Sequence, residues 1–264
     1  MRVEGKIALI TGGTSGIGAE TARLLAQEGA QVVIAGRSRD KGQALAEEIG
    51  PAARYVAADV TRAADIEAAI AAVLAAHGRL DILFNNAGAA PGASLQTLEP
   101  EMITRACTLL LSSVMLGTCH AAAAMERTGG GVIINNASIA GHRHRQGDIL
   151  YSTLKAGVAH FTRLAAVELG PKAIRVNAIS PGAIATPIFW GGSERANQLS
   201  PEENAAKLDK LRANLAKAAP LGISGEPRDI AEAVLYLAAE SGRFVTGHDL
   251  VVDGGRIAMF NEMA

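Results

Sequence analysis

The sequence predicts an α/β protein: one domain built on a doubly wound parallel sheet of about seven strands, with helices on both faces. Short β-branched segments alternate with longer segments rich in alanine and leucine along the 264 residues. The short segments are apolar on both faces, as parallel strands covered by crossover helices are. No break in composition divides the chain, so residues 1–264 are expected to form a single domain around one sizeable core.

The elements follow one another in a βα repeat. The expected strands are buried, apolar runs at Ile7–Ile10, Val32–Ile34, Tyr55–Ala57, Ile82–Phe84, Val132–Ile134, Val176–Ile179 and Leu250–Val252. The expected helices, several of which end at glycine, span Ile17–Glu28, Asp40–Ile49, Ala64–Ala76, Glu101–Met125, Tyr151–Leu169 and Pro227–Ala239. The segment from Pro187 to Pro220 breaks the repeat, and connections of this length are usually functional, so a substrate lid is expected at about residues 187–220.

Charge and cysteine content exclude several classes of partner. The chain has 25 Lys and Arg against 26 Asp and Glu, for a formal net charge of −1, and no long like-charged run, which argues against a nucleic-acid partner. No uninterrupted apolar run approaches the roughly 18 residues that cross a bilayer, so no membrane partner is expected. Cys107 and Cys119 are the two cysteines, which argues against a disulfide framework and predicts a cytoplasmic protein. The first strand, about five residues long, is too short for a signal-peptide core.

A glycine-rich turn follows the first expected strand, at Thr11-Gly12-Gly13-Thr14-Ser15-Gly16-Ile17-Gly18. Glycines here allow a tight turn and let the backbone approach a pyrophosphate, which the N-terminus of the following helix attracts. The alternative is a tight connection without a ligand. Because ligands bind beyond the carboxyl ends of strands in such sheets, the position favours a Rossmann-like domain that binds a dinucleotide.

The spacing Gly12-x-x-x-Gly16-x-Gly18 resembles that of the short-chain dehydrogenase/reductase family. The resemblance continues from about Lys6 to Gly255. Its further marks are Asp59 after the third strand, Asn85-Asn86-Ala87-Gly88 after the fourth, Ser138 after the fifth, Tyr151-x-x-x-Lys155, Pro181-Gly182 with Thr186, and Asp253-Gly254-Gly255.

This resemblance implies a nicotinamide cofactor, with Asp59 near the adenine, Asn86 to Gly88 along the adenosine half and Thr186 at the carboxamide. Local turn capping is the alternative role of Asp59 and Asn86. The expected cofactor contacts are Gly12, Thr14, Ser15, Gly16, Ile17, Gly18, Arg37, Asp59, Val60, Asn86, Ala87, Gly88, Tyr151, Lys155, Pro181, Gly182, Ile184 and Thr186. The family is usually a homotetramer, and the apolar faces of Glu101–Met125 and Tyr151–Leu169 are the expected subunit contacts.

The expected catalytic residues are Ser138, Tyr151 and Lys155. Tyr151 and Lys155 lie four apart, on one face of a helix, where a surface pair without function is the alternative. A positive charge about 4 Å from the phenol, at an effective dielectric near 20, favours the phenolate by roughly 4 kcal/mol before desolvation opposes it. Lys155 and an oxidised nicotinamide are therefore expected to make Tyr151 a competent base. Ser138 is expected to hydrogen-bond the substrate oxygen and to hold it for proton exchange with Tyr151.

One position departs from the family pattern. The family usually has an asparagine three residues before a glycine on the helix after strand four, and here Val114 precedes Gly117 at that spacing. Either the proton relay to solvent takes another route, for example through Ser113, or the family pattern is misaligned with this helix, and no asparagine of this helix is assigned a role.

Two further segments border the expected site. His142-Arg143-His144-Arg145 is either a solvated loop or a recognition element for a polar or anionic substrate group, and no carboxylate or cysteine cluster completes a metal site, so no metal is expected. Phe189 and Trp190, flanked by glycines in the lid, are either an apolar substrate wall or the contact that packs the lid onto the body.

The end of the second strand, Gly36-Arg37-Ser38-Arg39, bears on the choice of cofactor. NAD-dependent enzymes generally place here a carboxylate that binds the ribose hydroxyls and repels a 2′-phosphate, and Gly36 takes that place. Arg37 follows, and a guanidinium grips a phosphate with two parallel hydrogen bonds or stacks on adenine. NADP(H) is therefore favoured over NAD(H), with stacking of Arg37 in an NAD-dependent enzyme as the alternative.

Taken with the resemblance, these residues predict an NAD(P)-dependent oxidoreductase that interconverts a secondary alcohol and a ketone, with Tyr151 as general acid and base. One alternative is a reductase of a carbon–carbon double bond, whose family branch usually has a wider Tyr-to-Lys spacing. The other is a catalytically weak protein that senses the nucleotide, although such proteins typically lose the tyrosine or the lysine.

Overall fold

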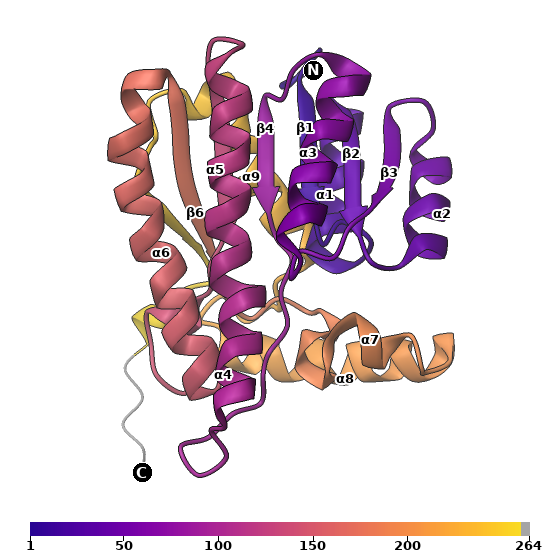
Figure 1. Cartoon of the computed structure of the whole chain (residues 1–264). Helices are drawn as coiled ribbons and strands as arrows, with labels where there is room; N and C mark the ends of the chain where they lie inside the picture. Colours follow the sequence, from indigo (N-terminus) through magenta and orange to yellow (C-terminus); the bar gives the residue numbers. More distant parts are fainter. Residues whose placement is uncertain (260–264) are drawn as a thin grey trace.

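The structure, a computed structural model, describes residues 1–259 of the chain, without the side chains of residues 193 and 194. Its centre is a seven-stranded parallel sheet in the order β3-β2-β1-β4-β5-β6-β7 (Figure 1). The strands are β1 (Ile7–Thr11), β2 (Gln31–Gly36), β3 (Ala53–Ala57), β4 (Ile82–Asn85), β5 (Gly131–Asn136), β6 (Ile174–Pro181) and β7 (Asp249–Val252). The predicted doubly wound parallel sheet is therefore confirmed.

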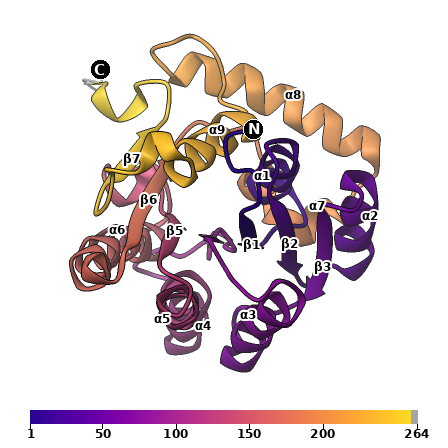
Figure 2. The same cartoon turned by 90° about the horizontal axis from the view of Figure 1, so that it is seen from above.

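Helices connect the strands and cover both faces of the sheet (Figure 2). They are α1 (Gly16–Gln27), α2 (Arg39–Ile49), α3 (Ala63–His77), α4 (Pro100–Cys107), α5 (Ser113–Glu126), α6 (Ile149–Leu169), α7 (Gly192–Ala196), α8 (Pro201–Ala218) and α9 (Pro227–Ala238). Single turns occur at η2 (Ile139–Gly141), η3 (Gly170–Lys172), η4 (Pro187–Trp190), η5 (Glu240–Gly242) and η6 (Arg256–Ala258).

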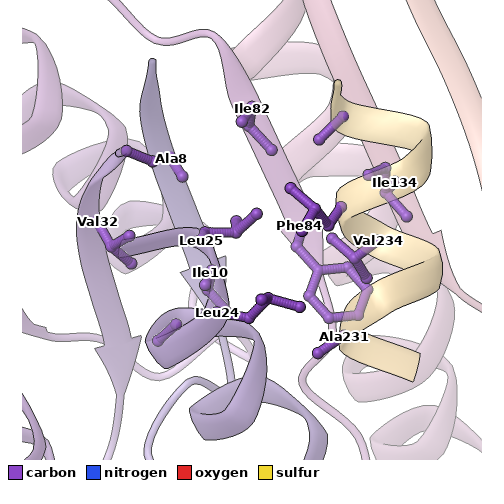
Figure 3. Close-up of a cluster of buried hydrophobic side chains, with 14 of the residues drawn as sticks. Ala8, Ile10, Leu24, Leu25, Val32, Ile82, Phe84, Ile134, Ala231 and Val234 are labelled. Carbon is purple, nitrogen blue, oxygen red and sulfur yellow. The ribbon is translucent and has the colours of Figure 1, made fainter. Parts of the chain in front are cut away.

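The hydrophobic core has two main layers, one on each face of the sheet. On one face, Leu24 and Leu25 of α1 and Val234 of α9 pack against Ile10 and Phe84 of the central strands (Figure 3). On the other face, α3, α5 and α6 cover the sheet with small and branched apolar side chains, which include Ile70, Val73, Ala121, Met125, Ala165 and Leu169. Both faces of β1 and β4 are therefore buried, which explains their continuous apolar sequence.

The two edge strands differ from the prediction of fully buried strands. Tyr55 and Val56 of β3 are partly buried and Ala57 is exposed, and all four residues of β7 are partly buried. The reason is their position, since β3 and β7 are the outermost strands and each has only one neighbour. Sequence pattern alone does not distinguish an edge strand from a central one.

The predicted helix Glu101–Met125 is also not regular. A π-helical turn, η1 (Thr108–Ser112), separates α4 from α5, and such turns often occur at functional sites. The whole stretch Pro100–Glu126 is long and apolar enough to cross a membrane by length and composition, and 44% of its most apolar window is buried inside the structure. Core helices pass the same test, and α5 packs against α3 on one face of the sheet.

Polar loops gather at the edge of the sheet where the parallel strands end. In Figure 1 the helices α7 and α8 lie across this edge, below the tips of the strands. The predicted site residues follow β1, β2, β3, β4, β5 and β6, so the topology brings them to this same edge.

Candidate active site

The turn after β1 is packed so closely that three of its glycines have no room for a side chain. A Cβ on Gly12, whose φ is +62°, would lie 2.7 Å from the Cα of Ala87. A Cβ on Gly18 would lie 2.4 Å from the carbonyl oxygen of Gly12, and one on Gly13 would lie 2.9 Å from Ile34. In contrast, a Cβ on Gly16 would meet only Thr186, at 3.7 Å. The turn is therefore tight against the body, while its outer side at the N-terminus of α1 is open toward the segment after β6.

Asn86 holds this turn from the neighbouring strand. Its Nδ2 donates to the carbonyl oxygens of Thr11 at 3.1 Å and Gly12 at 3.0 Å, and its backbone N–H donates to the Thr11 hydroxyl at 3.0 Å. Asn136 Nδ2 in turn donates to Asn86 Oδ1 at 2.8 Å. The capping role considered for Asn86 is thus present in the structure, and Thr11 and Asn136 join it as residues that the sequence analysis missed.

Asp59 lies in a turn after β3 and also makes local hydrogen bonds. Its Oδ1 accepts from the backbone N–H of Thr61 at 3.0 Å and from the Thr61 hydroxyl at 2.8 Å. Burial alone raises the pKa of Asp59, but these two bonds and the charges of Arg37 and Arg62 outweigh it and hold the pKa below its ordinary value. Asp59 is therefore ionised beside Arg37. A role for Asp59 and Val60 at the adenine stays a prediction.

Packing requires a glycine at position 36, at the end of β2. This is in addition to the effect on cofactor choice that the sequence analysis considered. A Cβ there would lie 2.8 Å from Thr14 Cγ2, so a larger residue would displace the glycine-rich turn. The turn after β1 and the end of β2 are therefore fitted to each other.

The helix α6 carries the predicted catalytic pair. It starts at Ile149, two residues before the predicted start, because Asp148 caps it and accepts a hydrogen bond from the Tyr151 N–H at 2.9 Å. Asp148 also accepts from the Gly92 N–H at 3.0 Å, which ties the loop after β4 to the start of α6. Tyr151 and Lys155 share one helix face, and Lys155 Nζ lies 5.6 Å from the centre of the Tyr151 ring. The two predicted residues are thus brought together on one helix face, where Lys155 is buried and Tyr151 is partly buried.

Burial dominates the ionisation of both groups. It raises the pKa of Tyr151 to about 12, and a hydrogen bond with Ser138 opposes this rise only in part, while the charge of Asp148 adds to it. Burial also lowers the pKa of Lys155 to about 8. The expectation that Lys155 and an oxidised nicotinamide together make Tyr151 a competent base concerns the cofactor complex and stays a prediction. Near neutral pH Tyr151 holds its proton, which suits donation to a substrate oxygen.

Lys155 is held from β5. Its Nζ donates to the carbonyl oxygen of Asn136 at 2.5 Å. The Oδ1 atom of Asn136 is buried and has no hydrogen-bond partner within residues 1–259. Since a buried acceptor without a donor is costly, this atom indicates that the site is completed by a donor from water or a ligand.

Ser138 lies two residues after the end of β5 and caps the start of the turn η2. Its Oγ accepts from the Ala140 N–H at 3.1 Å, and its hydroxyl also hydrogen-bonds Tyr151. Ser138, Tyr151 and Lys155 therefore form one connected group at the carboxyl end of β5, as predicted from the sequence.

The π-helical turn places Leu110 at this group. A Cβ on Gly88 would lie 3.1 Å from Leu110 Cδ2 and 3.9 Å from Lys155 Nζ, so these three residues are neighbours. Val114 instead packs in an apolar cluster with Ala137, Val158, Ala159 and Ala178. The Ser113 hydroxyl donates to the carbonyl oxygen of Leu109 at 2.6 Å, and a relay through Ser113 stays a prediction. The helix side of the site next to Lys155 is apolar.

The segment after β6 closes another side of the site. A Cβ on Gly182 would lie 2.3 Å from Ile139 Cδ1, so Gly182 packs directly on the turn that carries Ser138. Thr186 is buried and near Gly16, and Ile184 is buried as well, whereas Pro181 is partly buried at the end of β6. The predicted contacts from this segment are therefore near both the glycine-rich turn and the catalytic group.

The segment expected to be a lid contains η4, α7 and α8. Phe189 is 54% exposed, whereas the Trp190 indole nitrogen is buried with no partner in the described part of the chain. Lys41 of α2 donates to Asn197 Oδ1 at 2.5 Å, which connects the segment after α7 to the body. Both roles considered for Phe189 and Trp190, an apolar substrate wall and a packing contact of the lid, stay predictions. Over residues 1–259 no group of three His, Cys, Asp or Glu side chains is placed to hold a metal ion.

Comparisons with known proteins agree with this geometry. A family model described as "Enoyl-(Acyl carrier protein) reductase" matches residues 12–256. Momilactone A synthase from Oryza sativa subsp. japonica is 40% identical over 257 residues, which cover 96% of this chain and 90% of the relative. The chain belongs to the short-chain dehydrogenase/reductase family. It is an oxidoreductase of that family, as the sequence predicted.

Two further relatives have names that indicate their reactions. The mitochondrial borneol dehydrogenase of Lavandula x intermedia is 37% identical, over 99% of this chain and 93% of its own length. The crystal structure of 3-ketoacyl-(acyl-carrier-protein) reductase from Brucella melitensis, complexed with NADH, superposes with a TM-score of 0.84. It is 34% identical, and the match covers 96% of this chain and 99% of that one.

Proposed function

We propose that this short-chain dehydrogenase/reductase interconverts a secondary alcohol and a ketone with a nicotinamide cofactor. The observation that carries the proposal is the connected group of Ser138, Tyr151 and Lys155 at the carboxyl end of β5. Relatives named as a borneol dehydrogenase and as a 3-ketoacyl reductase support the alcohol and ketone chemistry.

Each of the three side chains has a separate role in this proposal. Ser138 hydrogen-bonds the substrate oxygen beside the Tyr151 hydroxyl. Tyr151, protonated near neutral pH, donates its proton to that oxygen during ketone reduction and takes it back during alcohol oxidation. Lys155 provides a buried positive charge next to the phenol, so it lowers the cost of forming phenolate when a proton leaves.

The glycine-rich turn supports the cofactor part of the proposal. Gly12, Gly13 and Gly18 let the turn lie flat against the body, and the N-terminus of α1 then attracts a pyrophosphate. We assign the cofactor contacts to Gly12, Thr14, Ser15, Gly16, Ile17, Gly18, Arg37, Asp59, Val60, Asn86, Ala87, Gly88, Tyr151, Lys155, Pro181, Gly182, Ile184 and Thr186. The nicotinamide, when bound, supplies or accepts the hydride.

NADP(H) is the proposed preference over NAD(H). No carboxylate stands at Gly36 to repel a 2′-phosphate, and Arg37 follows it. The relative solved with NADH supports only the shared nicotinamide chemistry. We expect Arg37→Ala to reduce kcat/KM for NADP by roughly tenfold or more and to change kcat/KM for NAD much less. A wild-type kcat/KM that favours NAD would overturn this preference.

We also propose a cytoplasmic homotetramer with a lid at about residues 187–220. Exposed apolar side chains on the outer faces of α5 and α6 support subunit contacts there, since Met115 is 39%, Leu164 59% and Val167 81% exposed. The free thiols Cys107 and Cys119 are consistent with a reducing compartment. Sedimentation as a monomer at micromolar concentration would refute the tetramer.

A panel of secondary alcohols, ketones and enones tests the proposed function, with each nicotinamide cofactor and absorbance of the reduced nicotinamide as readout. We expect turnover of alcohols and ketones. The name of the matching family model makes reduction of a carbon–carbon double bond the second candidate, although Tyr151 and Lys155 are only four residues apart. Turnover of the enones alone, with no alcohol or ketone accepted, would replace the proposal by that candidate.

A further inference from the structure

A histidine outside the catalytic group connects the Ser138 turn to the edge of the sheet. His142 directly follows the turn η2 that starts at Ser138, and its Nε2 lies 2.7 Å from Oδ2 of Asp249 on β7. The same nitrogen lies 3.1 Å from the Ser180 hydroxyl on β6. His142 therefore contacts two neighbouring strands from a position four residues after Ser138.

The chemistry of Asp249 determines which atom donates. The Asp249 side chain is only 5% exposed, and within the described part of the chain its Oδ1 is buried without a hydrogen-bond partner. A carboxylate only accepts hydrogen bonds, so His142 Nε2 carries the hydrogen and donates it to Asp249. This bond offsets part of the desolvation cost of the buried Asp249 carboxylate. Removal of His142 would leave that cost without compensation.

Close packing leaves the turn between Ser138 and His142 little space to move by itself. A Cβ on Gly141 would lie 2.8 Å from the backbone nitrogen of Ala156, next to Lys155 on α6. On the opposite side Ile139 packs on Gly182. A displacement of His142 is therefore transmitted along a packed turn to Ser138.

The residues after His142 are held by Arg256, near the end of the described chain. Arg143 Nη1 donates to the carbonyl oxygen of Arg256 at 2.6 Å, and Arg256 Nε donates to Gln146 Oε1 at 2.6 Å. Arg256 also donates to the carbonyl oxygen of Ala218, at the end of α8. The loop is thus attached to β6 and β7 through His142, and to η6 and the lid through Arg256.

We infer that His142 is a positioning residue, which acts through Asp249 and Ser180 to hold the Ser138 hydroxyl in its place beside Tyr151. The inference rests on the proposed function, because it assigns Ser138 a part in the reaction. It also assigns a role to the polar loop His142–Arg145, which the sequence analysis described as either a solvated loop or a recognition element. At least one of its histidines has a structural partner, so the loop is not simply solvated.

A double-mutant cycle with Ser138 tests the inference. We expect His142→Ala to lower kcat by roughly 10- to 100-fold, as small misplacements of reacting groups do, with an unchanged Kd for the cofactor. His142→Gln, which keeps an N–H donor at a similar reach, should recover most of the loss. In a Ser138→Ala background, His142→Ala should have no further effect on kcat, because the positioned hydroxyl is already absent. An equal loss of kcat in both backgrounds would overturn the inference.

Hydrogen exchange gives a readout that does not depend on activity. The Ala140 N–H donates to Ser138 Oγ, so exchange of the 138–142 backbone should be faster in His142→Ala and normal in His142→Gln. The exposed His160 on α6 provides the control, and His160→Ala should change neither exchange in this segment nor kcat. Unchanged exchange in His142→Ala overturns the inference. Failure of the wild type on the whole substrate panel instead refutes the proposed function and leaves the exchange test valid.

Discussion

Two long helices at the active-site edge differ in how they are held. The helix α6 has 21 residues and buries nine of them, including Lys155 and Leu154. The helix α8 has 18 residues and buries one, Leu215. Leu208 and Leu211 are only partly buried against a small cluster that contains Leu215, and an exposed polar contact, the bond of Arg212 to Glu226 at 2.8 Å, adds to this attachment.

The difference suits the two helices to different functions, α6 to positioning side chains and α8 to controlling access to them. A helix that buries a full face opens only with the whole domain, whereas a helix with few buried side chains opens locally at a lower free energy. Tyr151 and Lys155 lie on the first kind of helix, and the proposed lid contains the second. We therefore expect the proposed catalytic group to stay fixed and movement to occur in the residues of the proposed lid.

The largest effect is expected for the rigid side of this comparison, at Gly12. Gly12→Ala should lower the free energy of unfolding by about 3 kcal/mol, from a left-handed backbone and from overlap with Ala87, and should abolish cofactor binding. Gly78→Ala is the matched control, since Gly78 has a φ of +72° and no atom within 4 Å of its Cβ position. It should cost only about 1 kcal/mol. Equal losses by denaturant unfolding would show that the turn is not tightly packed.

The pH dependence of the free energy of unfolding tests whether Lys155 on the rigid helix α6 is desolvated. Its pKa falls from 10.5 to about 8 on folding, so the unfolded chain binds more protons between these pH values. The buried charge therefore destabilises the fold by at most about 3 kcal/mol below pH 8, and this cost disappears as the pH rises toward 10.5. Unfolding of the cofactor-free wild type, compared with Lys155→Met, should show this rise in the wild type alone. Parallel pH profiles would mean that Lys155 is not desolvated.

The smallest expected effect is a change in Trp190 fluorescence in the proposed lid. Trp190 is the only tryptophan and lies in the lid at the start of the weakly held segment. We expect its fluorescence to change when a verified substrate joins the cofactor complex, while backbone exchange in α8 is faster than in α6 before substrate is added. Unchanged fluorescence, or equal exchange in the two helices, would show that 187–220 is packed as part of the body.

The sequence predicted those features that depend on local pattern. β-branched runs identify all seven strands, and their placement predicts the parallel sheet because the crossover helices lie between them. Ser138, Tyr151 and Lys155 were predicted as a group because each follows or begins an element at the same edge of the sheet. The burial of β3 and β7 was not predictable, since it depends on which strands stand at the edges.

The missed features depend on partners far away in the chain. The π-helical turn that brings Leu110 to Gly88 and Lys155 reflects packing between segments, which a helical period does not show. The sequence argument considered the effect of a charge about 4 Å from the Tyr151 phenol before desolvation, whereas the burial that raises the pKa of Tyr151 to about 12 depends on the fold. The pair of His142 and Asp249 joins residues 107 positions apart, and only the fold brings them together.

Turnover by Tyr151→Phe tests the central claim most directly, that a fixed, partly buried tyrosine exchanges the proton with the substrate oxygen. The ring keeps its packing, and only the hydroxyl that bonds Ser138 is removed. With a substrate found for the wild type, the account predicts a kcat lower by about 100- to 10,000-fold and an unchanged Kd for the cofactor. A variant that keeps more than about a tenth of the wild-type kcat, well outside that range, would contradict the account and remove Tyr151 from the mechanism.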